Sequence, residues 1–310
     1  MWDFDSFIAK AKLYFARAEA HPVAEDEVVA LWLLLGLEFL LRAPLAQVHP
    51  TLLADPTGDS IMHAAGYPAG KPKSIQIQTV ISRLALVIPE FKPVATDAIF
   101  LVGLRNGELH NSESPLAVDQ VQWLPHFTRV VDVVCEYLDI DPAELVGENI
   151  IVHGRSLVDE EDKKLAHEIR TRIEAAKKHL AGLPAEEVTA RREALEQRPF
   201  PFGEKRTEEL LRLLARGRRI EAERVACPAC EAGVFLRLEA VRTTEERLVD
   251  DEVHREVVYI ARELFCPVCE LGLTTTAEIR AAGIEQQYVK VQVEDLSERY
   301  LGNYDDYGND

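Results

Sequence analysis

The sequence has few cysteines, and it lacks the apolar segments typical of secreted and membrane proteins. Five cysteines in 310 residues argue against a disulfide-stabilised framework in a chain of this size. No basic stretch leading into an apolar run opens the chain, so we expect no secretory signal. The most apolar stretch, residues 28–41, contains Glu38 and falls short of the ~20 residues that span a bilayer. We therefore expect a buried helix there, and a cytoplasmic protein that does not contact a membrane.

The motifs of several large enzyme classes are also absent. The sequence has no Gly-x-Ser-x-Gly elbow, no Walker loop and no dinucleotide fingerprint. His167 and Glu168 resemble the start of a zinc-protease helix, but Thr171 stands where the second His is required. We find no internal repeat and no low-complexity tract.

Positive charge is scarce overall and is concentrated in one part of the chain. The net charge of −18 argues against binding to nucleic acid, because phosphate contacts are driven by Lys and Arg. Residues 151–225, however, hold 17 Lys and Arg against 15 Asp and Glu. Such a run is either a solvated helix face or a contact with a phosphate backbone. The residues that would bind nucleic acid are Lys205, Arg206, Arg212, Arg216, Arg218 and Arg219.

Four of the five cysteines form two Cys-x-x-Cys pairs, which predict a metal site. Cys227 pairs with Cys230 and Cys266 with Cys269, and 35 residues separate the pairs. Two residues between cysteines let a tight turn direct both thiolates at one ion, and two such turns complete a tetrahedral sulfur shell. A thioredoxin-like redox site is not indicated, because such a site needs a single Cys-x-x-Cys pair at the start of a helix. We expect a structural Zn²⁺, since four thiolates leave no open position for water.

The segment between the two pairs fits a β-hairpin, as in a zinc ribbon. Residues 234–238 and 257–261 are short runs rich in β-branched and aromatic residues, and the polar residues 243–251 can turn between them. The spacer is longer than the roughly 15–20 residues commonest in ribbons. Cys135, the fifth cysteine, lies in an apolar helical run and is interpreted as a small core residue.

The first 182 residues or so are predicted to be mostly helical. Prolines break up the intervals between the helices, and residues 51–73 are expected to form an irregular loop. Apolar residues recur at helical spacing in six segments, near residues 4–19, 24–42, 74–88, 94–110, 117–139 and 157–182.

The predicted helix near residues 94–110 ends in a dense polar cluster, which is our candidate catalytic site. An apolar run leads into Arg105, Asn106 and His110. An imidazole can move protons to and from a 2′-hydroxyl or a leaving oxygen of RNA. A guanidinium can stabilise charge that develops on the scissile phosphate. The alternative is a polar helix terminus whose Arg and His bond neighbouring carboxylates.

This cluster resembles the ribonuclease motif of the HEPN family of small helical domains. That motif is Arg, a polar residue (often Asn), three variable residues and His, and Arg105, Asn106 and His110 match it position by position. The resemblance extends to the helical surroundings over roughly residues 1–140. It implies a homodimer with the motifs of two subunits lining one cleft, and an endoribonuclease that acts without metal. Such proteins are often toxins or anti-phage defence factors, which implies a cognate antitoxin or defence partner.

Helix geometry supports a composite site independently. Residues five apart on a helix lie about 140° apart around its axis, so Arg105 and His110 do not share one face. They converge only if the helix breaks at Gly107 or if a second subunit supplies the missing partner.

Glu38 stands within an apolar helix, where an ionised carboxylate is costly unless it is paired. Arg42, four residues on, is the obvious local partner. In the functional reading, Glu38 instead faces the cleft as a further catalytic-site residue and orients Arg105 or His110.

These patterns predict a mainly α fold, with an N-terminal HEPN-like helical bundle and a small C-terminal β zinc ribbon. The expected divisions are a HEPN-like helical domain, a charged helical connector, a zinc-ribbon domain and a frayed acidic tail, at residues 1–140, 141–222, 223–300 and 301–310 respectively.

The predicted activity is metal-independent transesterification of RNA. His110 would act as general acid or base, Arg105 would stabilise the phosphate, and Asn106 would position the backbone. The basic segment and the ribbon would recruit the substrate, for which a structured RNA such as tRNA is a candidate. The alternative is a non-catalytic zinc-ribbon adaptor or regulator that binds protein or nucleic acid, which the acidity of both end regions favours. A third reading is the neutralising half of a toxin pair.

Overall fold

The computed structural model divides the chain into two compact units, Met1–Glu161 (unit 1) and Asp162–Asp310 (unit 2). The predicted connector, residues 141–222, is thereby shared between the units, and the predicted tail, residues 301–310, lies outside the described residues. The structure describes residues 2–21, 26–68, 70–110, 112, 114–197, 220–244, 246–249 and 252–295.

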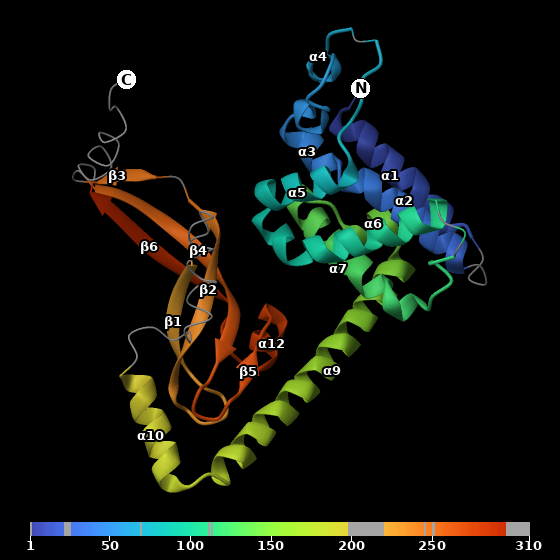
Figure 1. Ribbon diagram of the computed structural model, residues 1–310. Helices are drawn as coiled ribbons and strands as arrows, with labels where there is room; N and C mark the ends of the chain where they lie inside the picture. Colours follow the sequence, from blue (N-terminus) through green and yellow to red (C-terminus); the bar gives the residue numbers. More distant parts are fainter. Residues whose placement is uncertain are drawn as a thin grey trace. The chain divides into compact units, whose positions relative to one another are not determined.

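Unit 1 is built from helices (Figure 1). The helices expected near residues 4–19 and 94–110 are confirmed with nearly the predicted bounds. The helix expected from residue 117 begins only at Leu124, and the one expected from residue 157 begins at Glu148. The elements are α1 (Phe4–Glu19), α2 (Asp26–Leu40), α3 (Ala43–Val48), η1 (Pro50–Leu53), α4 (Ser60–Ala64), α5 (Ile77–Val87), η2 (Pro89–Val94), α6 (Ala95–His110), η3 (Gln120–Gln122), α7 (Leu124–Leu138), α8 (Pro142–Val146) and the first part of α9 (Glu148–Ala181).

The α2 region is the apolar centre of unit 1. The segment Glu27–Val48 is long and apolar enough to cross a membrane, but 61% of its most apolar window is buried inside the fold. Leu33, Leu37 and Leu40 are each at most 1% exposed. This is the buried helix predicted from residues 28–41, and its burial fits the core helix of a soluble protein.

Helices α7 and α9 approach each other closely at Gly154. A Cβ atom on Gly154 would lie 2.0 Å from Oγ1 of Thr128. Thr128 is 1% exposed, and its hydroxyl donates to the carbonyl oxygen of Leu124 at 2.8 Å. Rotating Thr128 away would break that bond, and its Cβ atom would still lie 3.2 Å from the added methyl group, so the contact favours glycine.

Replacing Gly154 with Ala is therefore expected to destabilise unit 1 by about 1–3 kcal/mol, because the extra methyl group overpacks the contact between α7 and α9. Urea unfolding followed by circular dichroism measures the change. Val152→Ala on the same helix is the control, since Val152 is 61% exposed and the substitution should change the stability little. Equal stability of the Gly154→Ala variant and the wild type would show that the two helices can move apart freely.

Unit 2 contains an antiparallel sheet with helices (Figure 1). The mainly α fold with a smaller β part in the C-terminal region is thus confirmed. In the sheet β1, β2, β4 and β3 are neighbours in that order, and β5 and β6 also pair with β4. The elements are the second part of α9, α10 (Ala185–Glu196), β1 (Ile220–Ala226), β2 (Gly233–Thr243), β3 (Arg247–Val249), β4 (Glu252–Phe265), β5 (Gly272–Leu273), α12 (Thr276–Ala281) and β6 (Gln287–Asp295).

The predicted hairpin between the cysteine pairs is formed by β2 and β4. Leu238 pairs with Ala261 in the antiparallel register, and the strand continues to the pair of Thr243 with Val257, so the predicted runs 234–238 and 257–261 meet at their ends and belong to neighbouring strands. Both strands extend beyond the predicted runs, and β3 pairs with the start of β4 within the segment expected to turn. These longer strands account for the length of the spacer.

The core of unit 2 includes the four cysteines. They belong to one buried cluster with the inner residues of β2 and β4, among them Tyr259. Ile169 and Ala176 of α9 and Leu195 of α10 are buried in the same cluster. Helices of the charged stretch before the sheet therefore contribute to this unit's core, which also contains the four predicted metal ligands.

Candidate functional site

Arg105 belongs to a cluster of three charged residues in unit 1. Glu38 of α2 forms an ion pair with Arg105 of α6 through Oε2 and with Arg42 through Oε1, at 3.1 Å from Nη1. Nη1 of Arg42 also donates to the carbonyl oxygen of Glu38 at 3.0 Å. The local pairing of Glu38 with Arg42 is present, and so is a contact with Arg105. Glu38 thus joins Arg42, the N-cap residue of α3, to the first residue of the predicted motif.

The cluster is mostly shielded from solvent, and its charges do not cancel. The side chains of Arg42, Arg105 and Glu38 are 10%, 12% and 21% exposed. Burial lowers the pKa of Arg42, the Glu38 carboxylate raises it, and the nearby charge of Arg105 lowers it further. Both guanidiniums stay protonated at neutral pH, because the ordinary pKa of arginine is so high. Two positive charges therefore share one carboxylate, which leaves a net positive charge beside α6.

Removing the charge of Glu38 is expected to destabilise unit 1. The Glu38→Gln variant leaves two shielded guanidiniums without a counter-ion, so we expect a loss of about 3 kcal/mol in the free energy of unfolding. The matched control is Glu161→Gln, because the Arg129–Glu161 pair is 29% and 39% exposed and should contribute less than about 1 kcal/mol. Urea titrations of both variants measure the difference. Equal losses would mean that the Glu38 cluster behaves as an ordinary surface ion pair.

His110 lies at the exposed end of α6, away from Arg105. The helix continues unbroken from Ala95 to His110, so Gly107 does not break it. The two motif residues consequently stay on different faces, about 140° apart. Of the two ways in which Arg105 and His110 could meet, only a contribution from a second subunit remains. Asn106, the middle motif residue, is half-buried.

The end of α6 is tied to the loop that follows it. Oε2 of Glu108 accepts a hydrogen bond from the backbone N–H of Leu116 at 3.2 Å, and Leu116 is 1% exposed. The hydrogen bond to buried Leu116, six residues after His110, thereby fixes the end of α6 that carries His110. The predicted nucleic-acid-binding residues, from Lys205 to Arg219, lie outside the described residues.

The four predicted metal ligands in unit 2 lie together. The Sγ atoms of Cys227 and Cys269 are 3.6 Å apart and those of Cys230 and Cys266 are 3.4 Å apart. All four sulfurs lie within 4.8 Å of one another and are buried. Sulfurs about 2.3 Å from a central ion in a tetrahedral shell are about 3.8 Å apart. The cluster therefore has the size and the donors to bind a metal ion.

The two cysteine turns repeat one backbone geometry. The N–H of Glu231 donates to the carbonyl oxygen of Cys227 at 2.9 Å, and the N–H of Glu270 donates to that of Cys266 at 2.8 Å. Glu231 and Glu270 have φ angles of 60° and 64°, which are uncommon for residues other than glycine. The fold thus holds both turns in the conformation that directs each pair of sulfurs inward.

The thiols influence one another strongly. Hydrogen bonds from Cys266 and Cys269 lower the pKa of Cys227. The hydrogen bond with Cys227, together with burial, raises the pKa of Cys269. Cys135 lies apart from this group in unit 1, where burial raises its pKa to about 12. It therefore remains a protonated core thiol, as predicted for a small core residue.

Helix α10 holds both cysteine turns, a role that the sequence did not reveal. Nη2 of Arg192 donates to the carbonyl oxygen of Cys230 at 3.2 Å. Nη1 of Arg191 donates to the carbonyl oxygen of Val268 at 3.2 Å and pairs with Glu270 at 2.9 Å. One arginine thus contacts each turn. In the sequence, the Arg191–Arg192 pair is one of many basic pairs in a charged segment, so nothing distinguishes it.

Comparisons of this chain with protein-family models, with curated proteins and with solved structures found no match.

Proposed function

We propose that this protein is a metal-independent endoribonuclease of the HEPN type that acts as a homodimer. The observation that carries the proposal is the placement of the motif residues. Arg105 is held by Glu38 at the edge of a shielded, net positive cluster, and His110 is exposed at the end of the same helix. Helix α6 therefore carries both a guanidinium that is paired with Glu38 and an exposed imidazole.

The exposed face of α6 supports the dimer. Ile99 and Phe100 are 53% and 41% exposed, and no neighbouring atom lies within 4 Å of the position of a Cβ on Gly103. At 3.6 residues per turn, Ile99, Gly103 and His110 lie within about 40° of one another around the helix axis. An apolar face with a glycine lets a second helix approach closely. A second copy of α6 packed there brings the ends of the two helices, each with its motif, to one interface.

The proposed reaction is transesterification at a phosphodiester. His110 removes the proton of the ribose 2′-hydroxyl, whose oxygen then forms a bond to phosphorus while the bond to the 5′-oxygen breaks. A water molecule gives a proton to the leaving 5′-oxygen, and His110 returns its own proton to solvent. Arg105 stabilises the negative charge on the phosphate oxygens. The products are a 2′,3′-cyclic phosphate and a free 5′-hydroxyl, and no metal takes part.

We also propose that the ion held by the four cysteines is Zn²⁺ in a structural role. Four buried thiolates form the closed sulfur shell that structural zinc prefers. Such a shell leaves no position for water, so the unit that carries it contributes to recruiting RNA or a partner and not to the reaction. An antitoxin or a defence partner is the protein class that suits a regulated ribonuclease.

An RNA-cleavage assay tests the proposal. The purified full-length chain is incubated with total RNA and with tRNA, in EDTA and in Mg²⁺, and retained metal is measured in parallel because chelation could remove the structural ion. Cleavage in EDTA that leaves cyclic phosphate ends is the expected result. Cleavage that requires added Mg²⁺ would overturn the mechanism.

The second candidate function is a non-catalytic adaptor or regulator. One observation favours it: the guanidinium of Arg105 is already paired with Glu38, as it would be in a purely structural ion pair. In that case the wild type cleaves no RNA, and the variants of Arg105 and His110 behave like the wild type in cells.

A further inference from the structure

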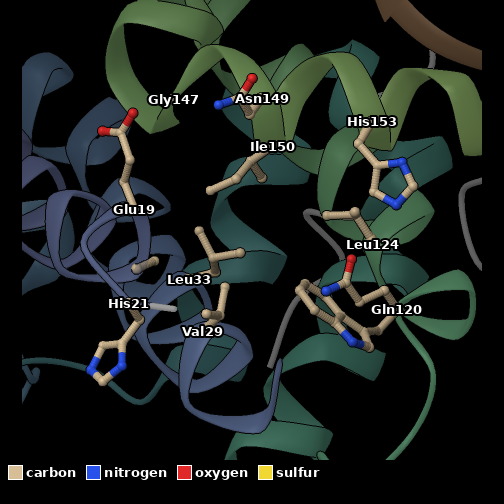
Figure 2. A pocket seen from close by; sticks show the side chains of 12 residues that line it. Glu19, His21, Val29, Leu33, Gln120, Leu124, Gly147, Asn149, Ile150 and His153 are labelled. Atoms are coloured by element: carbon tan, nitrogen blue, oxygen red, sulfur yellow. The ribbon is translucent and has the colours of Figure 1, made fainter. Parts of the chain in front are cut away.

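Unit 1 contains an open pocket that none of the proposed catalytic residues line. Its cavity volume is about 210 Å³, which is smaller than the pockets that take drug-sized ligands. Its walls come from the end of α1, the start of α2, the segment from η3 into α7, and the start of α9 (Figure 2). The lining residues are Ala18, Glu19, His21, Val29, Leu33, Gln120, Trp123, Leu124, Gly147, Asn149, Ile150 and His153.

The floor of the pocket is apolar. Figure 2 shows Val29, Leu33 and Ile150 at its centre. Leu33, Trp123 and Leu124 are each at most 3% exposed, so the floor is part of the packed core and keeps its shape without a ligand. Contact with this floor favours a ligand with a flat apolar body, since burying its faces removes apolar surface from water.

The rim of the pocket is polar and carries one permanent charge, that of Glu19. The lining residues include no Lys and no Arg, so a phosphate or a carboxylate would have no cation to pair with and would be repelled by Glu19. Figure 2 places Glu19 on one side, His153 and Gln120 on the other, and Asn149 between them. The ligand must therefore present hydrogen-bond donors to Glu19.

The Glu19 carboxylate is held at the start of α9. Its Cδ and Oε1 atoms lie 3.6 Å from the position that a Cβ on Gly147 would take, and Gly147 directly precedes the first residue of α9. The positive end of a helix dipole stabilises a carboxylate in that place. A carboxylate in this place can accept two N–H groups at once.

We propose that this pocket binds a purine base that has two adjacent N–H donors, as guanine does. The Glu19 carboxylate accepts from the ring N–H and the exocyclic amino group, in charge-assisted hydrogen bonds. The side-chain amide of Asn149 lies on the same rim and can bond the carbonyl oxygen of the base. The apolar floor contacts one face of the base, and the ribose and phosphate remain at the open mouth, away from Glu19.

Calorimetry with nucleosides tests the pocket independently of RNA cleavage, because a nucleoside has no phosphodiester to cleave. Guanosine is expected to bind the wild type more tightly than inosine, which lacks the amino group, or adenosine. Glu19→Gln should weaken guanosine binding by roughly tenfold or more. Asp5→Asn, an exposed carboxylate on the same helix, should leave it unchanged. Ile150→Trp fills the floor and should abolish binding, with circular dichroism confirming that it folds.

A second arm distinguishes a free nucleoside from a base within RNA. Single-stranded oligonucleotides of G and of U are titrated into the wild type and into Glu19→Gln. If the site binds a base within an RNA strand, Glu19→Gln should weaken binding of the G oligonucleotide and leave binding of the U oligonucleotide unchanged. If the site takes the free nucleoside, guanosine binds and neither strand depends on Glu19. Guanosine that does not bind at millimolar concentration, or that binds equally to Glu19→Gln, overturns the proposal and leaves the ribonuclease proposal standing.

Discussion

Replacing His110 with Ala is expected to lower the rate of RNA cleavage by about 10²- to 10⁴-fold, the loss typical for removal of a general acid or base. Replacing Arg105 with Ala should cost about 10²- to 10³-fold through loss of charge stabilisation at the phosphate. Initial rates on one defined RNA, measured in EDTA, give both values. His110 is exposed, so its replacement should not unfold the chain.

Matched controls separate chemistry from general effects on charge. His167 and Arg170 are exposed residues of α9, and their replacement with Ala removes the same side chains elsewhere. Both control variants should keep the wild-type rate. Arg105→Ala also breaks the contact with Glu38, so its stability must be measured beside its activity. A loss of activity in the controls equal to that in the motif variants would remove the motif from the mechanism.

Heterodimers of the two inactive variants test the composite site directly. Because α6 is helical through His110, each proposed centre takes Arg105 from one subunit and His110 from the other. A dimer of one Arg105→Ala and one His110→Ala subunit then keeps one of its two centres, and should show about half of the wild-type rate. Co-expression with two different tags allows that heterodimer to be purified. An inactive heterodimer, or a wild type that is monomeric, contradicts the composite centre.

The sequence predicted those features whose physical cause is local. Cys227 and Cys230 are separated by two residues because one turn must direct both sulfurs at one point, and the structure brings the two predicted pairs together. The burial of α2 followed from its continuous apolar stretch. The orientation of His110 relative to Arg105 followed from the helical repeat alone.

Contacts between distant segments could be anticipated only in part. Glu38 and Arg105 are 67 residues apart, and no local pattern brings them together. The sequence did show that Glu38 in an apolar helix needs a partner, and it named Arg42, which does pair with it. That Glu38 pairs with both arginines depends on the packing of α2 against α6.

Strand β6 shows how tertiary contacts can override an alternating pattern. Its valines, among them Val291 at 60% exposure, face solvent, although alternation alone would place them inside. The opposite face is occupied by polar residues that find specific partners. Lys290 pairs with Glu223 at 2.8 Å, and the side-chain N–H of Gln292 donates to the Tyr259 hydroxyl at 2.8 Å. These partners come from other strands, so the pattern within β6 could not reveal its orientation.

Loss of the metal is also expected to have a large effect, on the stability of unit 2. Replacing Cys227 with Ser should abolish stoichiometric zinc binding and unfold the sheet of unit 2, because the four cysteines are part of its buried core. Structural zinc contributes about 10–16 kcal/mol in small zinc-binding peptides, which exceeds the stability of most domains of this size. Elemental analysis should find one zinc per wild-type chain and none in the variant.

Hydrogen exchange locates the unfolding. The amides of β2 and β4 should lose their protection in Cys227→Ser, whereas those of α2 and α7 should keep it, because the core of unit 1 includes none of these four cysteines. The control is Cys135→Ala, which removes a buried thiol of unit 1 and should retain the zinc. If Cys227→Ser keeps its zinc, the four-sulfur shell is not the binding site. If α2 and α7 lose protection together with the sheet, the two units do not fold independently, and the metal then stabilises the helices that carry Arg105 and His110 as well.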